Sequence, residues 1–154
     1  MAGFTLVELV MTMVIIGILA AVVAPRFFAN NIFQSRGFAD QVQASLRYAQ
    51  KVAVAQRRVV CVAFDTAAVP NTLALTIDTN TPPDGACDAP LQSLTDGANY
   101  VIRAHAGVAF GTTPAPINFN YNALGVPSPA QSLSITGATD GITIEPETGY
   151  VHSP

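Results

Sequence analysis

The sequence predicts an α+β fold, in which a long N-terminal helix with a hydrophobic first half packs against a head of antiparallel strands. Residues Phe4–Ala24 form an apolar run whose only charge is Glu8. Apolar residues then recur at three- and four-residue steps between Phe28 and Ala53, which is the spacing of one helix face. From Val59 onward, short runs rich in β-branched and aromatic residues alternate with turn residues.

The apolar run has the length of a membrane-spanning helix. At about 1.5 Å per residue it crosses a hydrocarbon core, so we expect residues 4–25 to be transmembrane. A carboxylate in such a segment costs roughly 2.5–3.5 kcal/mol at the bilayer centre, and we therefore expect a compensating partner for Glu8. A cleaved secretory signal is disfavoured, because no Lys or Arg precedes the run and Val22-Val23-Ala24, followed by Pro25, is a poor cleavage site.

The second half of the helix is expected over residues 26–58, with one apolar and one polar face. Pro25 lacks a backbone hydrogen-bond donor and predicts a kink in the helix. Gly17, which has a low helix propensity, is a second position where the helix is expected to bend easily. Gly37 and Asn30-Asn31 predict a looser stretch. The section Phe27–Phe38 is expected to lie beyond the reach of the head and to contact other helices.

A basic cluster lies near the expected end of this helix. It consists of Arg47, Lys51, Arg57 and Arg58. Cations at a helix C-terminus interact favourably with the helix dipole, so a capping role is expected for the cluster rather than ligand binding.

The head is expected over residues 59–154, as one or two antiparallel sheets packed against the helix. Gly, Pro, Asn or Asp bound each candidate strand, as hairpin connections require. The candidate strands are Val59–Phe64, Leu73–Ile77, Tyr100–Ala104, Val108–Phe110, Ile117–Tyr121, Leu133–Thr136, Ile142–Ile144 and Tyr150–His152.

The N-terminus resembles the class III signal of type IV pilins and type II secretion pseudopilins. The resemblance rests on Gly3-Phe4-Thr5-Leu6-Val7-Glu8 followed by the apolar run. It implies a leader of residues 1–3, cleavage between Gly3 and Phe4 by a prepilin peptidase, and N-methylation of Phe4. It also implies that Glu8 pairs with the free amine of a neighbouring subunit during assembly. The leader lacks the basic residues that prepilin leaders usually carry.

Within that family, the chain resembles the GspH/FimT-type minor pilins, including MshC-like proteins of the MSHA pilus. A strand is expected directly after Arg58, without the long loop that follows the helix in major pseudopilins. Further segments support this resemblance, namely Arg36-Gly37-Phe38, Leu46-Arg47-Tyr48-Ala49, Ile117–Asn120 leading to Gly125, and Gly149-Tyr150-Val151.

The resemblance implies a structural minor pilin that takes part in initiation or tip assembly of a type IV pilus-like or type II secretion filament. Its partners would be the prepilin peptidase and N-methyltransferase, other minor pilins, the major pilin, the inner-membrane assembly platform and the lipid bilayer. The chain would cross the bacterial inner membrane once, with its head in the periplasm, before entering a surface pilus or a periplasmic pseudopilus.

Cys61 and Cys87 are the two cysteines of the chain. A head exported to the periplasm meets an oxidising compartment, where an even cysteine count indicates a disulfide. A buried thiol at Cys61 is the alternative, since this residue lies in a candidate strand.

The acidic loop from Asp78 to Asp88 raises the alternative of a calcium site. It begins like a calcium-binding loop, but Pro82 occupies the next ligand position and the distal Glu is missing. Turn formation explains these residues, so no metal site is expected.

The sequence contains no recognisable motif of catalytic residues. Glu145 and Glu147 bracket Pro146 in an expected turn without a nearby nucleophile, and His105 and His152 are isolated. We therefore expect no catalytic residues, no cofactor and no enzymatic activity.

Two further functions stay open. The same N-terminus permits a major pilin, which abundance in filaments would distinguish. A filament-borne binding module for adhesion or DNA uptake is the other alternative, but Arg103 is the only basic residue after Arg58 and the whole chain has a net charge of −3, which disfavours nucleic acid.

Overall fold

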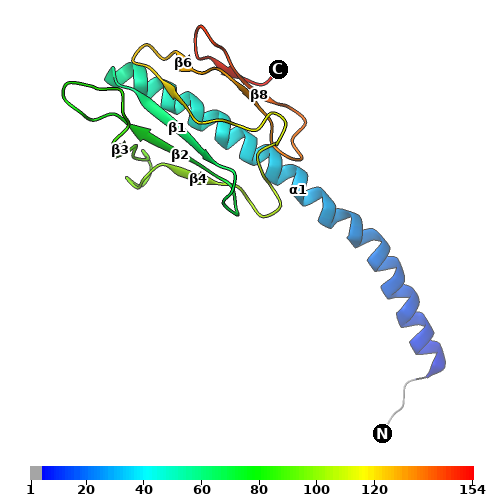
Figure 1. Cartoon of the computed structure of the whole chain (residues 1–154). Coiled ribbons are helices and arrows are strands. Elements are labelled where there is room, and N and C mark those ends of the chain that lie inside the picture. Colours follow the sequence, from blue (N-terminus) through cyan, green and yellow to red (C-terminus); the bar gives the residue numbers. More distant parts are fainter. Residues whose placement is uncertain (1–4) are drawn as a thin grey trace.

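The computed structural model describes the backbone of residues 5–154 and the side chains of residues 5–20 and 32–154. A helix of 51 residues, α1 (Leu6–Gln56), extends far beyond a head of short strands (Figure 1). The strands are β1 (Val60–Asp65), β2 (Thr72–Ile77), β3 (Ala89–Pro90), β4 (Val101–Arg103), β5 (Phe119–Tyr121), β6 (Pro127–Ser128), β7 (Ser132–Leu133), β8 (Ile142–Ile144) and β9 (Val151–His152).

Local chemistry explains where α1 begins and ends. Thr5 is the N-cap, with extended backbone angles and a side chain that accepts a hydrogen bond from the Glu8 N–H. Arg57 ends the helix in the left-handed conformation, at φ 52° and ψ 43°, and its N–H donates to the carbonyl of Ala53. A left-handed C-terminal residue is a common helix stop, although glycine is its usual occupant.

Between these ends α1 is unbroken. The looser stretch expected around Asn30-Asn31 and Gly37 is absent from the described backbone, since helix continues through all of them. The helix also continues through Gly17 and Pro25. The kink expected at Pro25 falls in residues 21–31, whose side chains lie outside the description, and it stays a prediction.

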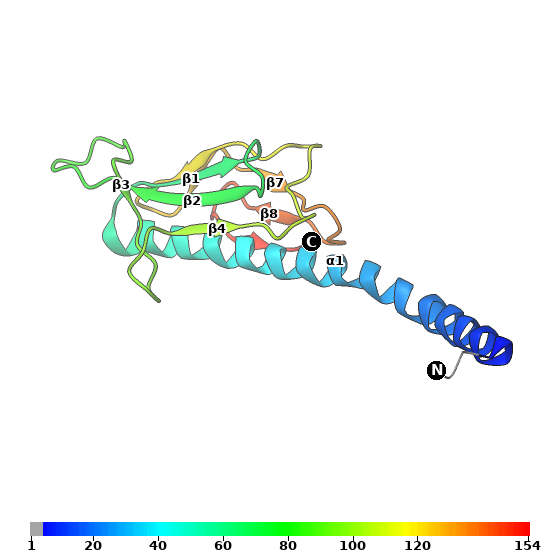
Figure 2. The ribbon, with the colours of Figure 1, turned by 90° about the horizontal axis from the view of Figure 1, so that it is seen from below.

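The larger sheet has the order β3-β2-β1-β5-β6, and β4 also pairs with β2. Its centre is the antiparallel β1–β2 hairpin, in register from Val60 opposite Ile77 to Asp65 opposite Thr72. A smaller antiparallel sheet has the order β7-β8-β9. Figure 2 shows that the strands form a layer along one side of the C-terminal half of α1.

The core forms where this layer meets one face of α1. Alternate residues of β1 and β2 point inward, as their alternating burial shows. The helix contributes residues at three- and four-residue steps, and an aromatic chain extends the contact: Phe38 lies 5.3 Å from Phe110 between ring centroids, and Phe110 lies 5.2 Å from Phe64. The buried apolar residues among the described side chains of α1 are Phe38, Val42, Leu46, Ala49, Val52 and Ala53.

Polar contacts attach the smaller sheet and the turns to α1. The Ser35 hydroxyl donates to the carbonyl of Thr136 at 2.7 Å. The Gln50 amide donates to the carbonyls of Gly125 and Thr148, at 3.2 and 2.6 Å, and so joins two turns that are distant in sequence. A Cβ at Gly149 would collide with the Gly125 carbonyl, so this position requires glycine.

Several expectations about strands need correction. No strand covers Val108–Phe110, where the described structure has only an isolated bridge between Phe110 and Ile135. The expected strand Leu133–Thr136 is reduced to β7, which ends at Leu133. The two-residue strands β3 and β6 were not predicted, because each contains a proline and has too few residues to show an alternating pattern.

The expectation for the section Phe27–Phe38 is wrong at its C-terminal end. Ser35 and Phe38 are buried against the head, whereas Ile32 and Phe33 are exposed. The head extends further along the helix than expected because Phe110 contacts Phe38 and the Thr136 carbonyl accepts from Ser35.

The capping role expected for the basic cluster is also wrong for two of its members. The Arg47 guanidinium donates to the carbonyl of Val151, and that of Arg58 donates to the carbonyls of Asp78 and Asn80. Both side chains bind strands and loops that sequence spacing does not place near the helix.

Candidate functional site

The first turn of α1 places Glu8 where a carboxylate is electrostatically favoured. Thr5 Oγ1 accepts from the Glu8 N–H at 3.3 Å, and the Leu9 N–H donates to the Thr5 carbonyl at 3.1 Å. Unpaired N–H groups give this end of a helix about half a positive charge. The sequence Thr5-Leu6-Val7-Glu8 has the spacing of a capping box, a signal for the helix start that the sequence analysis overlooked.

The surroundings of Glu8 are apolar and exposed. Its carboxylate is the only charged group on the described side chains of residues 5–20. Leu6 is 79% exposed and Met13 is 67% exposed, and the side chains around them are similarly uncovered because the head lies more than twenty residues further along the helix. A long exposed apolar surface on one chain requires a cover of lipid or of other protein chains.

Among the residues whose side chains the structure describes, no helix is both long enough and apolar enough to cross a membrane. The predicted transmembrane segment of residues 4–25 lies partly outside those residues and stays a prediction.

A second feature is the loop between β2 and β3, which a disulfide attaches to β1. Cys61 and Cys87 are bonded, with their Cα atoms 6.2 Å apart, which confirms the predicted bridge and excludes the alternative of a free thiol at Cys61. From the helix end, Arg58 Nη1 donates to the carbonyls of Asp78 and Asn80 at 3.1 and 2.7 Å. The loop is thereby held at both ends.

The carboxylates of this loop serve as turn acceptors. Asp78 is fully buried and accepts from the N–H groups of Asn80 and Gly85, while Asp88 accepts from the Thr79 N–H and hydroxyl. The two hydrogen bonds from Thr79 lower the pKa of Asp88, and the bond from the Thr79 hydroxyl contributes most. Within the described residues, no group of three or more His, Cys, Asp or Glu is placed to hold a metal ion.

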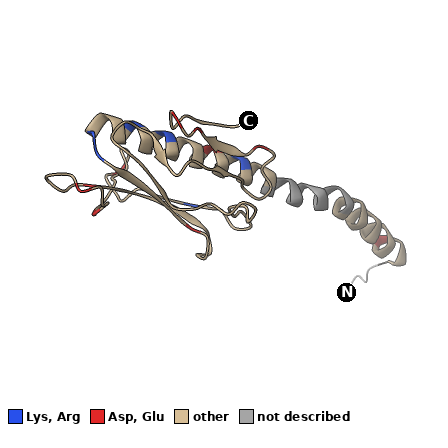
Figure 3. Ribbon diagram, turned by 45° about the horizontal axis from the view of Figure 1, so that its top comes forward, with Lys and Arg blue, Asp and Glu red and all other residues tan. Residues whose placement is uncertain are grey.

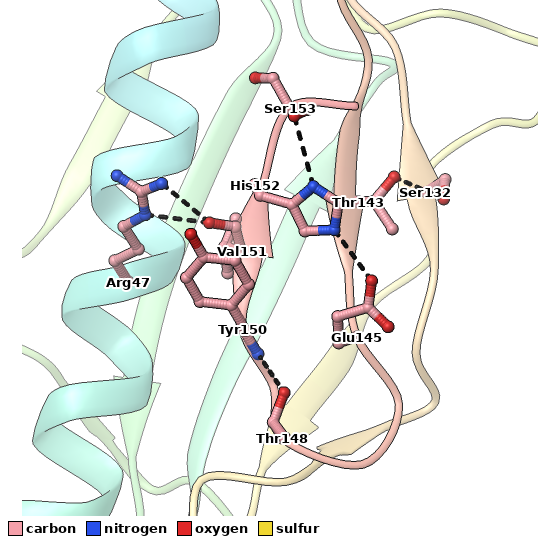
Figure 4. A network of polar contacts seen from close by, with 9 residues as sticks. All are labelled: Arg47, Ser132, Thr143, Glu145, Thr148, Tyr150, Val151, His152 and Ser153. Atoms are coloured by element: carbon pink, nitrogen blue, oxygen red, sulfur yellow. Dashed lines mark hydrogen bonds and ion pairs between the residues drawn. The ribbon is translucent and has the colours of Figure 1, made fainter.

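A third feature is the polar network at the C-terminal edge of the head (Figure 4). Arg47 on α1 donates twice to the Val151 carbonyl, from Nε at 3.0 Å and from Nη2 at 2.9 Å. On the next strand residue, His152 Nε2 lies 2.8 Å from Glu145 Oε1. The hydrogen bond to Glu145 is the main cause that raises the pKa of His152, and the Ser153 carbonyl adds to it.

This network does not have the arrangement of a hydrolytic relay. The two ring nitrogens of His152 face a carboxylate and a backbone carbonyl, while the hydroxyls of Ser132 and Thr143 lie 3.2 Å from one another. A relay would need a hydroxyl hydrogen-bonded to the imidazole. The geometry supports a structural role, in which these contacts hold α1, β8 and β9 together.

A family model for the prokaryotic N-terminal methylation motif matches residues 1–24. This match supports the resemblance of the N-terminus to that of type IV pilins and pseudopilins. No curated protein gives a significant match to the chain.

Two solved structures share the pilin fold. The minor pseudopilin EpsH from the type 2 secretion system of Vibrio cholerae is 16% identical, with a TM-score of 0.58 over 79% of this chain and 96% of that one. The type IV minor pilin FimU of Pseudomonas aeruginosa PAO1 is 19% identical, with a TM-score of 0.57 over 83% of this chain and 92% of that one. At these identities the likeness shows the fold.

Of the three residues to which the N-terminal motif assigns a role, Glu8 alone lies within the described part of the chain. Gly3 and Phe4, the expected cleavage and methylation positions, lie outside the described residues. His152 was predicted to be isolated, but it pairs with Glu145, which lies seven residues earlier in the chain and directly follows the neighbouring strand β8. His105, expected on a strand, follows β4 in an exposed turn.

Proposed function

We propose that this pilin-family subunit is a structural minor pilin or pseudopilin that takes part in initiation or tip assembly of a type IV pilus-like or type II secretion filament. The observation that carries the proposal is the lone carboxylate of Glu8 in the first turn of a long, exposed apolar helix. The minor role is supported by the direct step from α1 to β1, with only Arg57, Arg58 and Val59 between them. It is also supported by the fold shared with two minor subunits.

The proposed life cycle starts in the inner membrane. The apolar segment of residues 4–25 anchors the chain, and its head faces the periplasm, where the disulfide is stable. A prepilin peptidase cuts between Gly3 and Phe4, and an N-methyltransferase modifies Phe4. The processed subunit then joins other minor pilins and the major pilin at the inner-membrane assembly platform.

The proposed role of Glu8 follows from its electrostatics. An unpaired carboxylate among apolar side chains costs free energy once water is excluded, and a cation within about 4–6 Å relieves that cost. The positive end of α1 already favours the charge. We propose that the free amine of a neighbouring subunit supplies the missing cation, so that pairing sets the axial position of one helix beside the next.

The alternatives differ in abundance and in surface chemistry. A major pilin would use the same N-terminus, but it would dominate the mass of the filament. A head that binds DNA needs a basic surface, whereas residues 59–154 contain one basic and eight acidic side chains, a net charge of −7. This charge disfavours nucleic acid and leaves adhesion to a non-acidic ligand as the binding alternative.

The test replaces Glu8→Ala in cells that carry no other copy. The variant is expected to be inserted and processed normally, but filament yield should fall by about tenfold or more, because removing one partner of a desolvated charge pair costs about 2–5 kcal/mol. Asp40→Ala is the matched control, since it removes an exposed carboxylate from the same helix. Normal filaments in the Glu8→Ala strain would reject the pairing mechanism.

Mass spectrometry of the native protein tests the processing and the minor role together. We expect a mature N-terminus at N-methyl-Phe4 in inner membranes, with little of the protein in sheared filaments. The same terminus as the dominant species of the filament fraction would identify a major pilin. A terminus near Pro25 would contradict the proposed processing.

A further inference from the structure

Two uncharged segments form the end of the head from which α1 projects. Residues 66–71 are the turn between β1 and β2, and residues 104–118 connect β4 to β5. We call these two segments the head base. The strand β1 begins beside the C-terminal end of α1 and runs back along the helix, so the turn after it lies toward the projecting part of α1 (Figure 2). Neither segment contains Asp, Glu, Lys or Arg, and His105 is the only side chain in them that can carry a charge.

The acidic residues of the head lie elsewhere. Of the eight acidic side chains in residues 59–154, six lie in the stretches 78–96 and 145–147, away from the head base. The head therefore carries its negative charge on its other loops and presents an uncharged surface toward the projecting helix.

The remaining two carboxylates lie at the margin of the head base, each near a cation. Asp65 and Arg103 are both in register with Thr72, one from β1 and the other from β4. Asp140 and Arg36 line the same small hollow between the head and α1. Two acidic and two basic side chains leave this margin without net charge.

The head base is also apolar and held in shape. Val69 at the tip of the first segment is 97% exposed, and a mainly apolar hollow of about 530 Å³ lies between the two segments. The buried Asn71 amide donates to the carbonyls of Thr66 and Ala68, and its oxygen accepts from the Phe110 N–H, each at 2.9 Å. One side chain thus ties both segments together and holds the hollow open.

The head base lies close to the expected membrane surface. Thr136 borders the hollow and accepts from Ser35, which is ten residues beyond Pro25 and so about 15 Å further along the helix. The headgroup layer covers roughly 5–7 Å of that distance. Because the head lies on one side of α1, a lean of the helix toward that side lowers the base further. Membrane helices lean by about 20° on average, and Pro25 is an expected kink.

We propose that the head base rests on the lipid surface while the chain is anchored in the membrane. Val69 enters the headgroup layer, where an exposed apolar side chain is stabilised. Anionic lipids repel carboxylates, so an acidic head can approach such a surface only through its uncharged end. The inference rests on the proposed function in requiring that residues 4–25 anchor the chain.

The test is quenching of a single tryptophan by lipids that carry a spin label on the headgroup. The sequence contains no Trp, so Val69→Trp introduces an unambiguous reporter. The full chain is placed in lipid nanodiscs of phosphatidylethanolamine and phosphatidylglycerol, with one chain in each disc so that neighbouring subunits are absent.

Leu124→Trp is the matched control. Leu124 is 81% exposed in the turn after β5, and β5 runs antiparallel to β1, so this turn lies at the opposite end of the head. We expect the labelled lipids to quench the tryptophan of Val69→Trp several-fold more strongly than that of Leu124→Trp. Equal quenching of the two would overturn the proposal.

A second pair of variants tests the chemistry of the surface. With the reporter at the exposed Ala106, as Ala106→Trp, the added change Val69→Asp should reduce quenching to the level of Leu124→Trp, because it places a carboxylate in the head base. The added change Leu124→Asp should leave the quenching of Ala106→Trp unaltered. No effect of Val69→Asp would contradict a contact with lipid.

The outcomes separate this contact from the proposed function. Co-elution of the chain with the discs measures membrane anchoring independently of the tryptophan. A chain that co-elutes but shows no selective quenching at residue 69 would refute the lipid contact and leave the proposed function standing. A chain that fails to enter the discs would refute the anchoring, and the lipid contact with it.

Discussion

His152 and Glu145 show how one side-chain pair can secure the C-terminal edge of the head. His152 lies on β9 and Glu145 directly follows β8, so their 2.8 Å contact joins two strands that share only two backbone pairings. Arg47 holds the same edge from the helix side through the Val151 carbonyl. These contacts are expected to keep β9 paired with β8 and packed on α1.

The pair predicts a pH-dependent stability. Its hydrogen bond raises the pKa of His152 in the folded state above the reference value of 6.5. The stabilisation is therefore complete below about pH 6.5 and is lost as the pH rises through the folded-state pKa. His152→Gln should reduce the difference between the unfolding free energies measured by urea denaturation at pH 5.5 and pH 8.

His105→Gln is the control, because His105 is exposed and its side chain has no hydrogen-bond partner among the described residues. Glu145→Gln should act like His152→Gln. An unchanged pH dependence in both the His152 and the Glu145 variants would contradict a stabilising pair.

Among the secondary-structure elements, β1 organises the head. It pairs with β2 on one side and β5 on the other, and Cys61 at its start carries the disulfide to the loop before β3. The loop has no apolar core of its own. Its order depends on the disulfide, on Arg58 and on the buried Asp78, all of which act at its base.

Removing the disulfide should therefore destabilise the head. For a sequence separation of 26 residues, the chain-entropy model gives a loss of about 3.5 kcal/mol. We expect this difference between the wild type and the Cys61→Ala/Cys87→Ala variant in urea denaturation. Reduction of the wild type with dithiothreitol should produce a similar loss, and an equal stability of oxidised and reduced protein would show that the bridge constrains only the loop.

Elements were predictable where their signal is local and repeated. The helix and the strands β1, β2, β4, β5, β8 and β9 follow from runs with a clear period or composition. The strands β3 and β6 have two residues each and contain proline, so their pairing depends on the neighbouring strand that is already in place. The strand predicted at Val108–Phe110 does not form, because these residues are apolar for core packing and not for strand pairing. Val108 and Phe110 bury their side chains, and Phe110 forms only an isolated bridge.

In the whole molecule, charge is segregated along the chain. Residues 26–58 contain six basic side chains and one acidic side chain, a net charge of +5, whereas the head has a net charge of −7. Figure 3 shows Lys and Arg mainly along the C-terminal half of α1 and Asp and Glu mainly on loops. His152 with Glu145 is the one ion pair among the described residues.

The molecule also divides into a projecting helix and a head that is expected to fold without it. A variant of residues 32–154 retains Ser35, Phe38 and every other described core residue. We expect it to be soluble without detergent and to unfold in a single cooperative urea transition.

A variant of residues 40–154 is the matched control. It loses Phe38, whose ring is buried against Phe110, and the Ser35 hydrogen bond to Thr136. Its unfolding free energy should be lower by about 3–5 kcal/mol, the usual cost of removing a buried aromatic side chain. Equal stability of the two variants would show that the first turns of α1 at the head contribute little to the core.

The sequence alone predicted the N-terminal site, because its signal is contiguous. Glu8 stands out as the only charge in an apolar run, and Gly3 and Phe4 precede it in a recognisable motif. The long helix, the strand-rich head and the Cys61–Cys87 pairing also followed from short segments, composition and cysteine count. Each of these inferences needs only neighbouring residues or simple totals.

Only the tertiary structure decided which distant residues meet. Arg47 and Arg58, predicted as helix caps, bind carbonyls 104 and 20 residues away, and Gln50 joins turns at Gly125 and Thr148. Such contacts are set by packing of the whole head on one helix face, and hydrophobic periodicity identifies that face without specifying which strand covers each turn of it.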